Sequence, residues 1–121
     1  SSVRSSVDAA CSAISDKIEY LTEFLGGDYE VQGAYPAWEY RENSRLRECM
    51  VSVFERMFME KPIIGAIHAG LECGLLSGKI KNLDAVSFGP DILDIHTPNE
   101  RLDIKSTERM YNYLTEVLKE L

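Results

Sequence analysis

The side chains best suited to catalysis or metal binding lie between Ala66 and Glu100, a stretch that contains both histidines of the chain. His96 belongs to the polar segment DIHTPNE, which follows an apolar run, and α/β proteins place functional groups at the carboxyl ends of their strands. Its neutral imidazole could bind zinc, and an exposed loop histidine without a chemical role is the alternative. Asp91, Asp94 and Glu100 match no recognised local zinc spacing. A hydrolytic zinc centre needs three or more protein ligands and an open position for water, so a site with His96 requires ligands from elsewhere.

His68 and Glu72 form the second candidate pair, four residues apart in the segment HAGLECG. If residues 69–78 are helical, the two side chains share a face, and Glu72 could orient the imidazole or bind a cation. A solvent-facing ion pair explains the same spacing, and the second histidine of an HExxH motif is absent. Gly70 and Gly74 could let the backbone approach a ligand closely, or could serve packing. These alternatives stay open at this point.

Cys73 raises the question of a cysteine nucleophile, because a thiol at a helix N-terminus can be activated. The segment GLECG instead has Glu72 at the position where the nucleophile elbow requires its reactive residue, and no third orienting group is evident. We therefore expect Cys73 to be a small buried apolar residue.

The elements that position these groups can be predicted from apolar periodicity. Alternating spacings of four and three predict a helix from Val7 to Leu25, with Ser5 or Ser6 as its cap and Gly26 and Gly27 at its end. Further helices are expected from Ser44 to a point before Pro62, between residues 67 and 83, and after a cap at Ser106. The expected buried faces are Val7, Cys11, Ile14, Ile18, Leu21 and Leu25 in the first helix; Leu46, Met50, Val53, Phe54 and Met57 in the second; and Tyr111, Leu114, Leu118 and Leu121 in the last.

Short apolar or alternating segments predict strands at residues 1–5, 29–34, 62–67 and 83–88. The first two flank the first helix and would form a β-α-β unit, and the last two would be inner strands of a parallel sheet. The sequence therefore predicts an α/β fold. The connector YPAWEY suits a boundary near Tyr40.

Composition limits the classes of partner. The chain has 121 residues with 45% hydrophobic content, which suits one domain or two pieces of a larger protein. Thirteen basic and twenty acidic residues give a net charge of -7, which argues against nucleic acid and against anionic membrane surfaces. The three cysteines have irregular spacing that fits a reducing cytoplasm. Nothing in the sequence predicts a membrane span or a signal peptide.

Several segments resemble a known family. HAGLECGLLSGKI, LDAVSFGPDI and IHTPNERLDI, followed by STERMYNYL, resemble the C-terminal part of the aminoacyl-histidine dipeptidases, also called Xaa-His or β-Ala-His dipeptidases. RSSVD, YPAWEY and SRLRE extend the resemblance over nearly the whole chain. It implies that residues 1–40 are the C-terminal part of an inserted lid and dimerisation domain, and that residues 41–121 are the C-terminal part of a zinc-peptidase catalytic domain.

The resemblance also implies an activity and site residues. The family is expected to be dimeric, with two zinc ions per catalytic domain, and to hydrolyse dipeptides with C-terminal histidine, such as β-Ala-His. His96 matches its last zinc ligand, in the block H-[ST]-P-[DN]-E, and His68 and Glu72 match a block that lines the substrate side of the cleft. The remaining ligands and the general base belong to HxD and EE blocks, which this sequence lacks. No catalytic residue is therefore expected in this chain, its zinc site is expected to be incomplete, and the isolated chain is expected to be inactive.

Two interpretations of the whole chain remain. The first residue is not methionine, which favours a C-terminal fragment of a cytoplasmic zinc dipeptidase. The alternative is a free-standing binding or dimerisation module, derived from that family, that has no catalysis. A native mass equal to the 13.7 kDa of this chain would favour the module.

Overall fold

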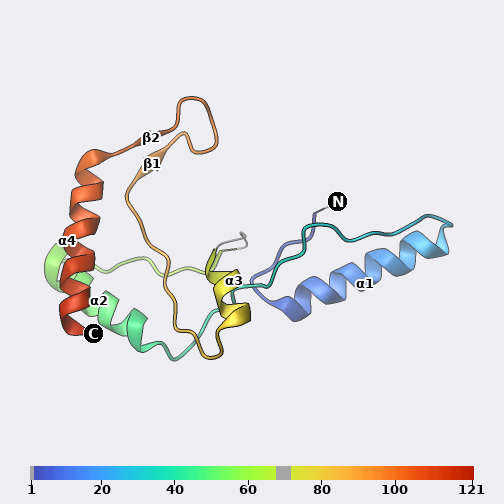
Figure 1. Cartoon of the computed structure of the whole chain (residues 1–121), viewed down its shortest axis with the longest axis horizontal. Coiled ribbons are helices and arrows are strands. Elements are labelled where there is room, and N and C mark those ends of the chain that lie inside the picture. The colour runs from blue at the N-terminus through green and yellow to red at the C-terminus, as the bar shows by residue number, and fades with distance from the viewer. Residues whose placement is uncertain (1, 68–71) are drawn as a thin grey trace. The chain divides into compact units, whose positions relative to one another are not determined.

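A computed structural model describes residues 2–67 and 72–121, and these ranges contain four helices and one small sheet (Figure 1). The elements are α1 (Asp8–Phe24), α2 (Arg45–Phe58), α3 (Glu72–Lys79), β1 (Ile92–Leu93), β2 (Arg101–Leu102) and α4 (Ile104–Glu120). They belong to two compact units, one of Ser1–Glu42 and Ile64–Leu83, the other of Asn43–Ile63 and Asp84–Leu121. Within the described ranges, no helix combines the length and the apolar content that crossing a membrane would require.

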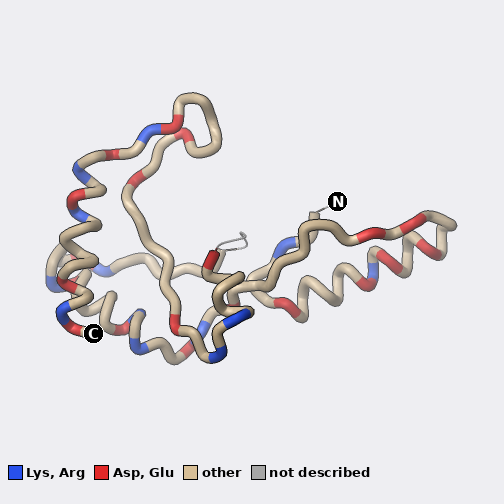
Figure 2. Tube along the Cα trace, in the orientation of Figure 1, with Lys and Arg blue, Asp and Glu red and all other residues tan. Residues whose placement is uncertain are grey.

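In the first unit, α1 confirms the predicted helix, but not its cap or its buried face. Its N-cap is Val7, which makes no side-chain capping bond, so the prediction of a cap at Ser5 or Ser6 is wrong. The chain leaves the helix at Gly26, whose φ of 79° is left-handed as predicted. No α1 residue is buried, and Leu21 is 57% exposed. Most of the charged side chains along α1 are acidic (Figure 2). The helix therefore presents both an exposed apolar stripe and a negatively charged surface.

The connector around Pro36 holds the first unit together. The Asp8 side chain at the start of α1 accepts a hydrogen bond from the Ala37 amide at 2.7 Å, and the Glu39 carboxylate accepts one from the Asp8 amide at 3.2 Å. In α3, Gly74 is buried, and a Cβ at this position would lie 2.7 Å from the Pro36 carbonyl oxygen. This close approach supports the packing interpretation of Gly74.

The core of the second unit lies where α2 packs on α4, and it consists of Met50, Val53, Tyr113 and Val117. The Tyr113 hydroxyl donates to the Met50 carbonyl oxygen at 2.7 Å. The rings of Phe54 and Phe88 meet the Tyr113 ring edge to face, with centroids 5.6 and 5.5 Å away. Such perpendicular contacts suit aromatic quadrupoles and add to the stabilisation from burial.

The start and the inward face of α2 are as predicted. Ser44 is the N-cap, and its Oγ accepts from the Arg47 amide at 3.0 Å while donating to Asp84 at 2.6 Å. Met50 and Val53 are buried, and Leu46, Phe54 and Met57 are packed against them in part. The predicted face therefore coincides with the observed core.

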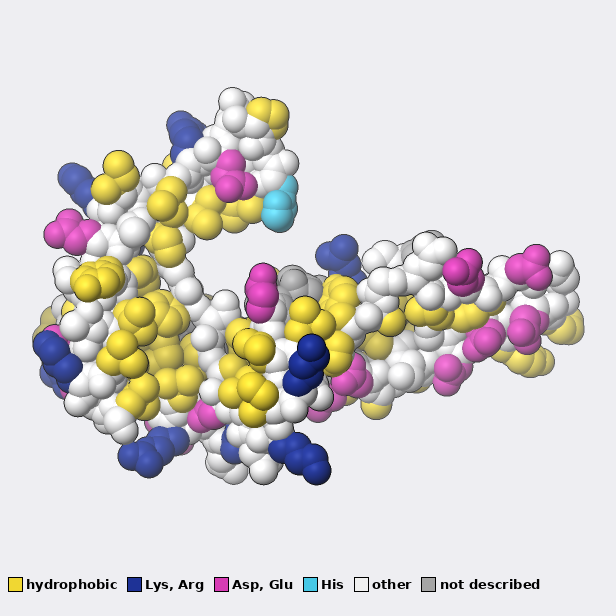
Figure 3. Space-filling model, viewed as in Figure 1, with side chains coloured by type: hydrophobic (Ala, Val, Ile, Leu, Met, Phe, Trp, Pro, Cys, Tyr) yellow, Lys and Arg dark blue, Asp and Glu magenta, His cyan; other side chains and the backbone are white. Residues whose placement is uncertain are grey.

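The helix α4 turns a different face inward than the sequence predicted. Its N-cap is Asp103 and not Ser106; the Asp103 carboxylate accepts from the Ser106 amide at 2.6 Å. The buried residues of the inward face are Tyr113 and Val117. The predicted face is exposed: Tyr111 is 70% exposed, and Leu114, Leu118 and Leu121 are also exposed. The two faces differ by one residue, or about 100° around the helix. The surface view shows apolar side chains over this unit (Figure 3).

None of the predicted strands forms a ladder among the described residues, so the expected β-α-β unit and parallel sheet are not found there. The sheet consists of β1 and β2, antiparallel, with Ile92 opposite Leu102 and Leu93 opposite Arg101. An apolar run favours extended backbone, but a strand also needs a neighbour for its N–H and C=O groups. Consecutive segments joined by a short loop supply that neighbour to each other.

Candidate functional site

His96 lies at the surface, in the loop that joins β1 to β2. Its φ is 65° and that of Asp94 is 54°, so both residues adopt the left-handed conformation. Asp and His are enriched among the few non-glycine residues found there, yet the conformation costs on the order of 1–3 kcal/mol. Contacts within the loop must therefore hold the backbone.

A tight set of hydrogen bonds supplies those contacts. The Asp94 carbonyl accepts from the Thr97 amide at 3.2 Å and from the Thr97 hydroxyl at 2.7 Å. The Glu100 amide donates to the Thr97 carbonyl at 3.1 Å, and the Glu100 carboxylate accepts from the His96 amide at 2.9 Å. The loop is thus closed by backbone turns and by one carboxylate that reaches back four residues.

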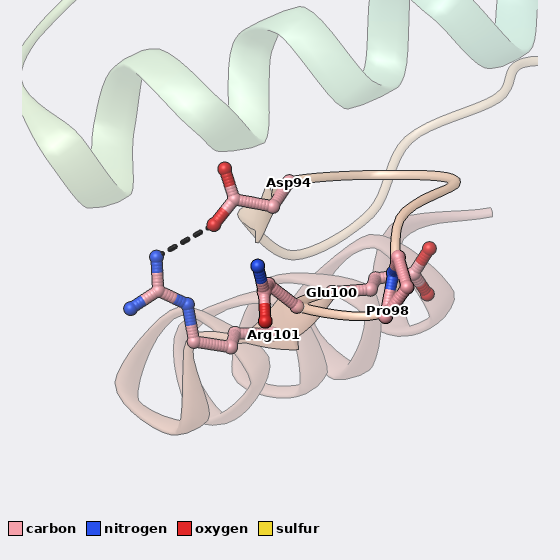
Figure 4. Close-up of a pocket in the computed structure, with 5 residues that line it drawn as sticks. Asp94, Pro98, Glu100 and Arg101 are labelled. Atoms are coloured by element: carbon pink, nitrogen blue, oxygen red, sulfur yellow. Dashed lines mark hydrogen bonds and ion pairs between the residues drawn. The ribbon is translucent and has the colours of Figure 1, made fainter.

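An ion pair joins the two ends of the same loop. The Arg101 guanidinium lies 2.7 Å from the Asp94 carboxylate (Figure 4). Both residues line an open surface hollow of about 480 Å³, together with Pro98, Asn99 and Glu100. The hollow is polar and exposed, so these charges remain solvated and the pair contributes at most about 1 kcal/mol.

The base of the hairpin is fixed to α4 through Ser106, which is 1% exposed. Its Oγ accepts from the Asp91 amide at 2.8 Å and donates to the Asp103 carbonyl at 2.8 Å. The Asp103 amide donates to the Asp91 carbonyl at 3.0 Å, which joins the two chain segments directly. The loop with His96 therefore extends from a buried, hydrogen-bonded anchor.

His96 offers one zinc-type donor. Across residues 2–67 and 72–121, no group of three or more His, Cys, Asp or Glu side chains could hold a metal ion. The nearest carboxylates already have partners, since Asp94 pairs with Arg101 and Glu100 accepts from the His96 backbone. The described residues thus fit a zinc centre only as the source of a single ligand, and no hydrolytic step follows from them.

Glu72 and Cys73, two other residues considered from the sequence, belong to the first unit. Glu72 is the first residue of α3 and is exposed, where its charge complements the helix dipole. His68 lies outside the described residues, so its proposed pairing with Glu72 stays a prediction. Cys73 is a free thiol of intermediate exposure, so the expectation of a small buried residue is wrong.

The roles of Glu100 and Ser106 differ from those expected from the sequence. Glu100, which matches no zinc spacing, accepts from the His96 amide, and Ser106, expected to cap the last helix, anchors the hairpin. The available signals were the separation of four residues between His96 and Glu100, and the apolar residues Ile92, Leu93 and Leu102 on either side of the DIHTPNE segment. Neither signal identifies a contact without the left-handed backbone at His96.

Known proteins show a clear similarity to this chain, although no protein-family profile matches it. The cytosol non-specific dipeptidase of Escherichia coli (strain K12) is 36% identical over 119 residues, which are 98% of this chain and 24% of that protein. The crystal structure of an aminoacylhistidine dipeptidase from Vibrio alginolyticus matches with a TM-score of 0.84 and 32% identity, over 97% of this chain and 24% of that one. The chain spans about a quarter of the length of each.

Proposed function

Because this chain is homologous to the C-terminal portion of the aminoacyl-histidine dipeptidase family, we propose that it is one part of a dipeptidase and contributes His96 to its metal centre. The observation that carries the proposal is the exposed imidazole on a loop whose left-handed backbone is held by hydrogen bonds. Strained backbone conformations concentrate at functional sites, so a strained and hydrogen-bonded histidine at the surface favours a ligand role.

In this proposal the complete protein holds two zinc ions, and His96 binds one of them. Zinc, when bound, polarises the peptide carbonyl and lowers the pKa of bound water. The contribution of this chain is to present the imidazole; the other ligands and the general base come from outside it. His68 and Glu72 are proposed to contact the dipeptide, and no residue of the chain is proposed as catalytic.

The proposed substrates are dipeptides with C-terminal histidine, such as β-Ala-His. The two relatives bear names of different breadth, since one is called non-specific and the other aminoacylhistidine dipeptidase. A panel that compares β-Ala-His and other Xaa-His dipeptides with dipeptides lacking histidine decides the range. Comparable kcat/KM values for both groups would replace the Xaa-His proposal with a broad dipeptidase.

We further propose that residues 1–40 belong to a lid and dimerisation domain, residues 41–121 to the catalytic domain, and that the complete protein is a cytoplasmic homodimer. The apolar stripe of α1 and its C-cap residue supports a partner surface, because Leu21 and Leu25 are 57% and 80% exposed. The word cytosol in the name of the Escherichia coli relative supports the compartment. Light scattering of the complete protein tests the dimer; a monomer at high concentration would contradict it.

The direct test of the proposed function is His96→Ala in the complete protein, with Glu108→Ala as a control at an exposed position of α4. We expect the variant at His96 to lose zinc, measured as metal content per subunit after dialysis, and the control to retain it. Unchanged zinc content in the His96 variant would remove the ligand assignment.

The isolated 121-residue chain, supplied with zinc and β-Ala-His, is expected to release no histidine. Zinc-dependent release by the pure chain would show that the site is complete within it and would contradict the division of ligands proposed above.

A further inference from the structure

We propose that Glu100 is a positioning residue for His96, because its carboxylate fixes the backbone conformation from which the imidazole is presented. The inference rests on the proposed function in one respect, since positioning matters to catalysis only if His96 is a zinc ligand.

His96 has a left-handed backbone that is costly to maintain. With φ at 65°, its Cβ crowds the neighbouring carbonyl, and an unrestrained loop would return to a right-handed or extended conformation. The Glu100 carboxylate opposes this return by accepting the His96 amide at 2.9 Å. Hydrogen bonds to ionised acceptors are about twice as strong as those between neutral groups.

Glu100 is itself held in place by the backbone around it. Its amide donates to the Thr97 carbonyl at 3.1 Å, and the next residue, Arg101, is paired with Leu93 in the sheet. The carboxylate therefore reaches back from a rigid base. The other side-chain hydrogen bonds of the loop connect Asp94, Thr97 and Asn99 and do not involve His96. The hydrogen bond that the Glu100 carboxylate accepts does involve it.

The two acidic residues of the loop, Asp94 and Glu100, have different partners. The guanidinium of Arg101 is engaged by Asp94 at 2.7 Å, at the base of the loop. Glu100 is thus left to bind the His96 amide at its tip. Each carboxylate therefore has its own partner in the loop.

The test labels only this 121-residue segment of the complete protein with ¹⁵N-histidine, by ligation to an unlabelled remainder, so the two histidines of the segment give two backbone amide signals. The signal of His96 is assigned by its loss in His96→Gln. In Glu100→Ala we expect the His96 amide to exchange with solvent roughly tenfold faster and its proton signal to move upfield. Glu100→Gln keeps a carbonyl oxygen as acceptor and should restore most of the protection, while Glu108→Ala should change neither. A His96 amide unaffected by Glu100→Ala would overturn the contact.

The second readout is zinc affinity in the complete dipeptidase, measured by chelator competition. We expect Glu100→Ala to weaken it about tenfold, as is typical when a group that orients a ligand is removed, and Glu100→Gln to recover it. If Glu100→Ala alters the amide but leaves zinc affinity unchanged while His96→Ala weakens it, the positioning role is overturned. If His96→Ala itself leaves zinc affinity unchanged, the proposed function fails instead, and the amide measurement still decides the contact.

Discussion

Ser106→Ala is the substitution that most directly tests how the loop of His96 is anchored. The hydroxyl is buried, accepts from the Asp91 amide at 2.8 Å and donates to the Asp103 carbonyl at 2.8 Å. The Asp103 carbonyl has two other donors, the amide and the hydroxyl of Thr107, at 3.1 and 3.0 Å. It therefore stays satisfied in the variant, while the Asp91 amide loses its acceptor.

The magnitude follows from this difference. The Asp91 side chain is exposed, so water reaches part of the freed amide, and the loss is about one net hydrogen bond with a small void, or about 1–2 kcal/mol in the free energy of unfolding. Thr107→Ala is a matched control, because it removes a hydroxyl that contacts the same carbonyl from an exposed position and should cost less than about 0.5 kcal/mol.

The assay is urea unfolding of the chain followed by circular dichroism, combined with hydrogen exchange at the Asp91 amide. We expect Ser106→Ala to lower the unfolding free energy and to speed exchange at Asp91, and Thr107→Ala to do neither to a comparable degree. Equal unfolding free energies for the two variants would refute the reasoning that Ser106 anchors the hairpin.

Two further predictions concern the two units separately. Burial, and to a lesser extent electrostatic repulsion from the nearby Cys49 side chain, raises the pKa of Tyr113 above 10.0. Because the unfolded chain then loses this proton first, the free energy of unfolding should fall as pH rises above about 10. Tyr113→Phe should reduce that fall, and it should lower the free energy of unfolding by about 1 kcal/mol at pH 8. The same decrease in urea midpoint between pH 8 and pH 11 for both proteins would contradict this prediction. In the first unit, Gly74→Ala should lower the free energy of unfolding by about 1–3 kcal/mol, because its Cβ would lie 2.7 Å from the Pro36 carbonyl oxygen. Gly65→Ala is the control and should not lower it, because a Cβ at Gly65 has nothing within 4 Å. Equal thermal midpoints for the two alanine variants would exclude the clash.

The helices α2 and α4 show where apolar periodicity is sufficient and where it is not. α2 has a single apolar stripe that includes Met50 and Val53, and its cap at Ser44 marks the start, so both were predictable. α4 has two stripes one residue apart. The sequence favoured the one through Tyr111, but the shape and the hydroxyl of Tyr113 fit the Met50 region of α2. Choosing between two apolar faces requires knowing the partner, which a single helix does not encode.

The prediction of strands was wrong for a different reason. Residues 62–67 and 83–88 have the composition of inner strands, but composition does not supply the neighbouring backbone that a ladder needs. Two pairs of residues around the DIHTPNE segment do form a ladder, because the turn at Asp94 and Thr97 brings them together. Local turn geometry therefore decided the sheet in the described residues, and apolar content did not.

In the candidate site, one residue could be predicted from the sequence and another could not. The residue type of His96 and its polar segment were enough to select it from the sequence, since imidazole is the side chain that metal chemistry most often uses. Glu100 could not be selected, because a separation of four residues implies a contact on a helix and no contact in an ordinary loop. The left-handed φ at His96 and Asp94 tightens the loop, so that the carboxylate meets the amide four residues before it. The conformation that is costly for His96 is thus the same one that gives Glu100 its partner, and each depends on the other. Replacing His96 by glycine in this chain should consequently leave the loop closed, because glycine adopts the same backbone without strain.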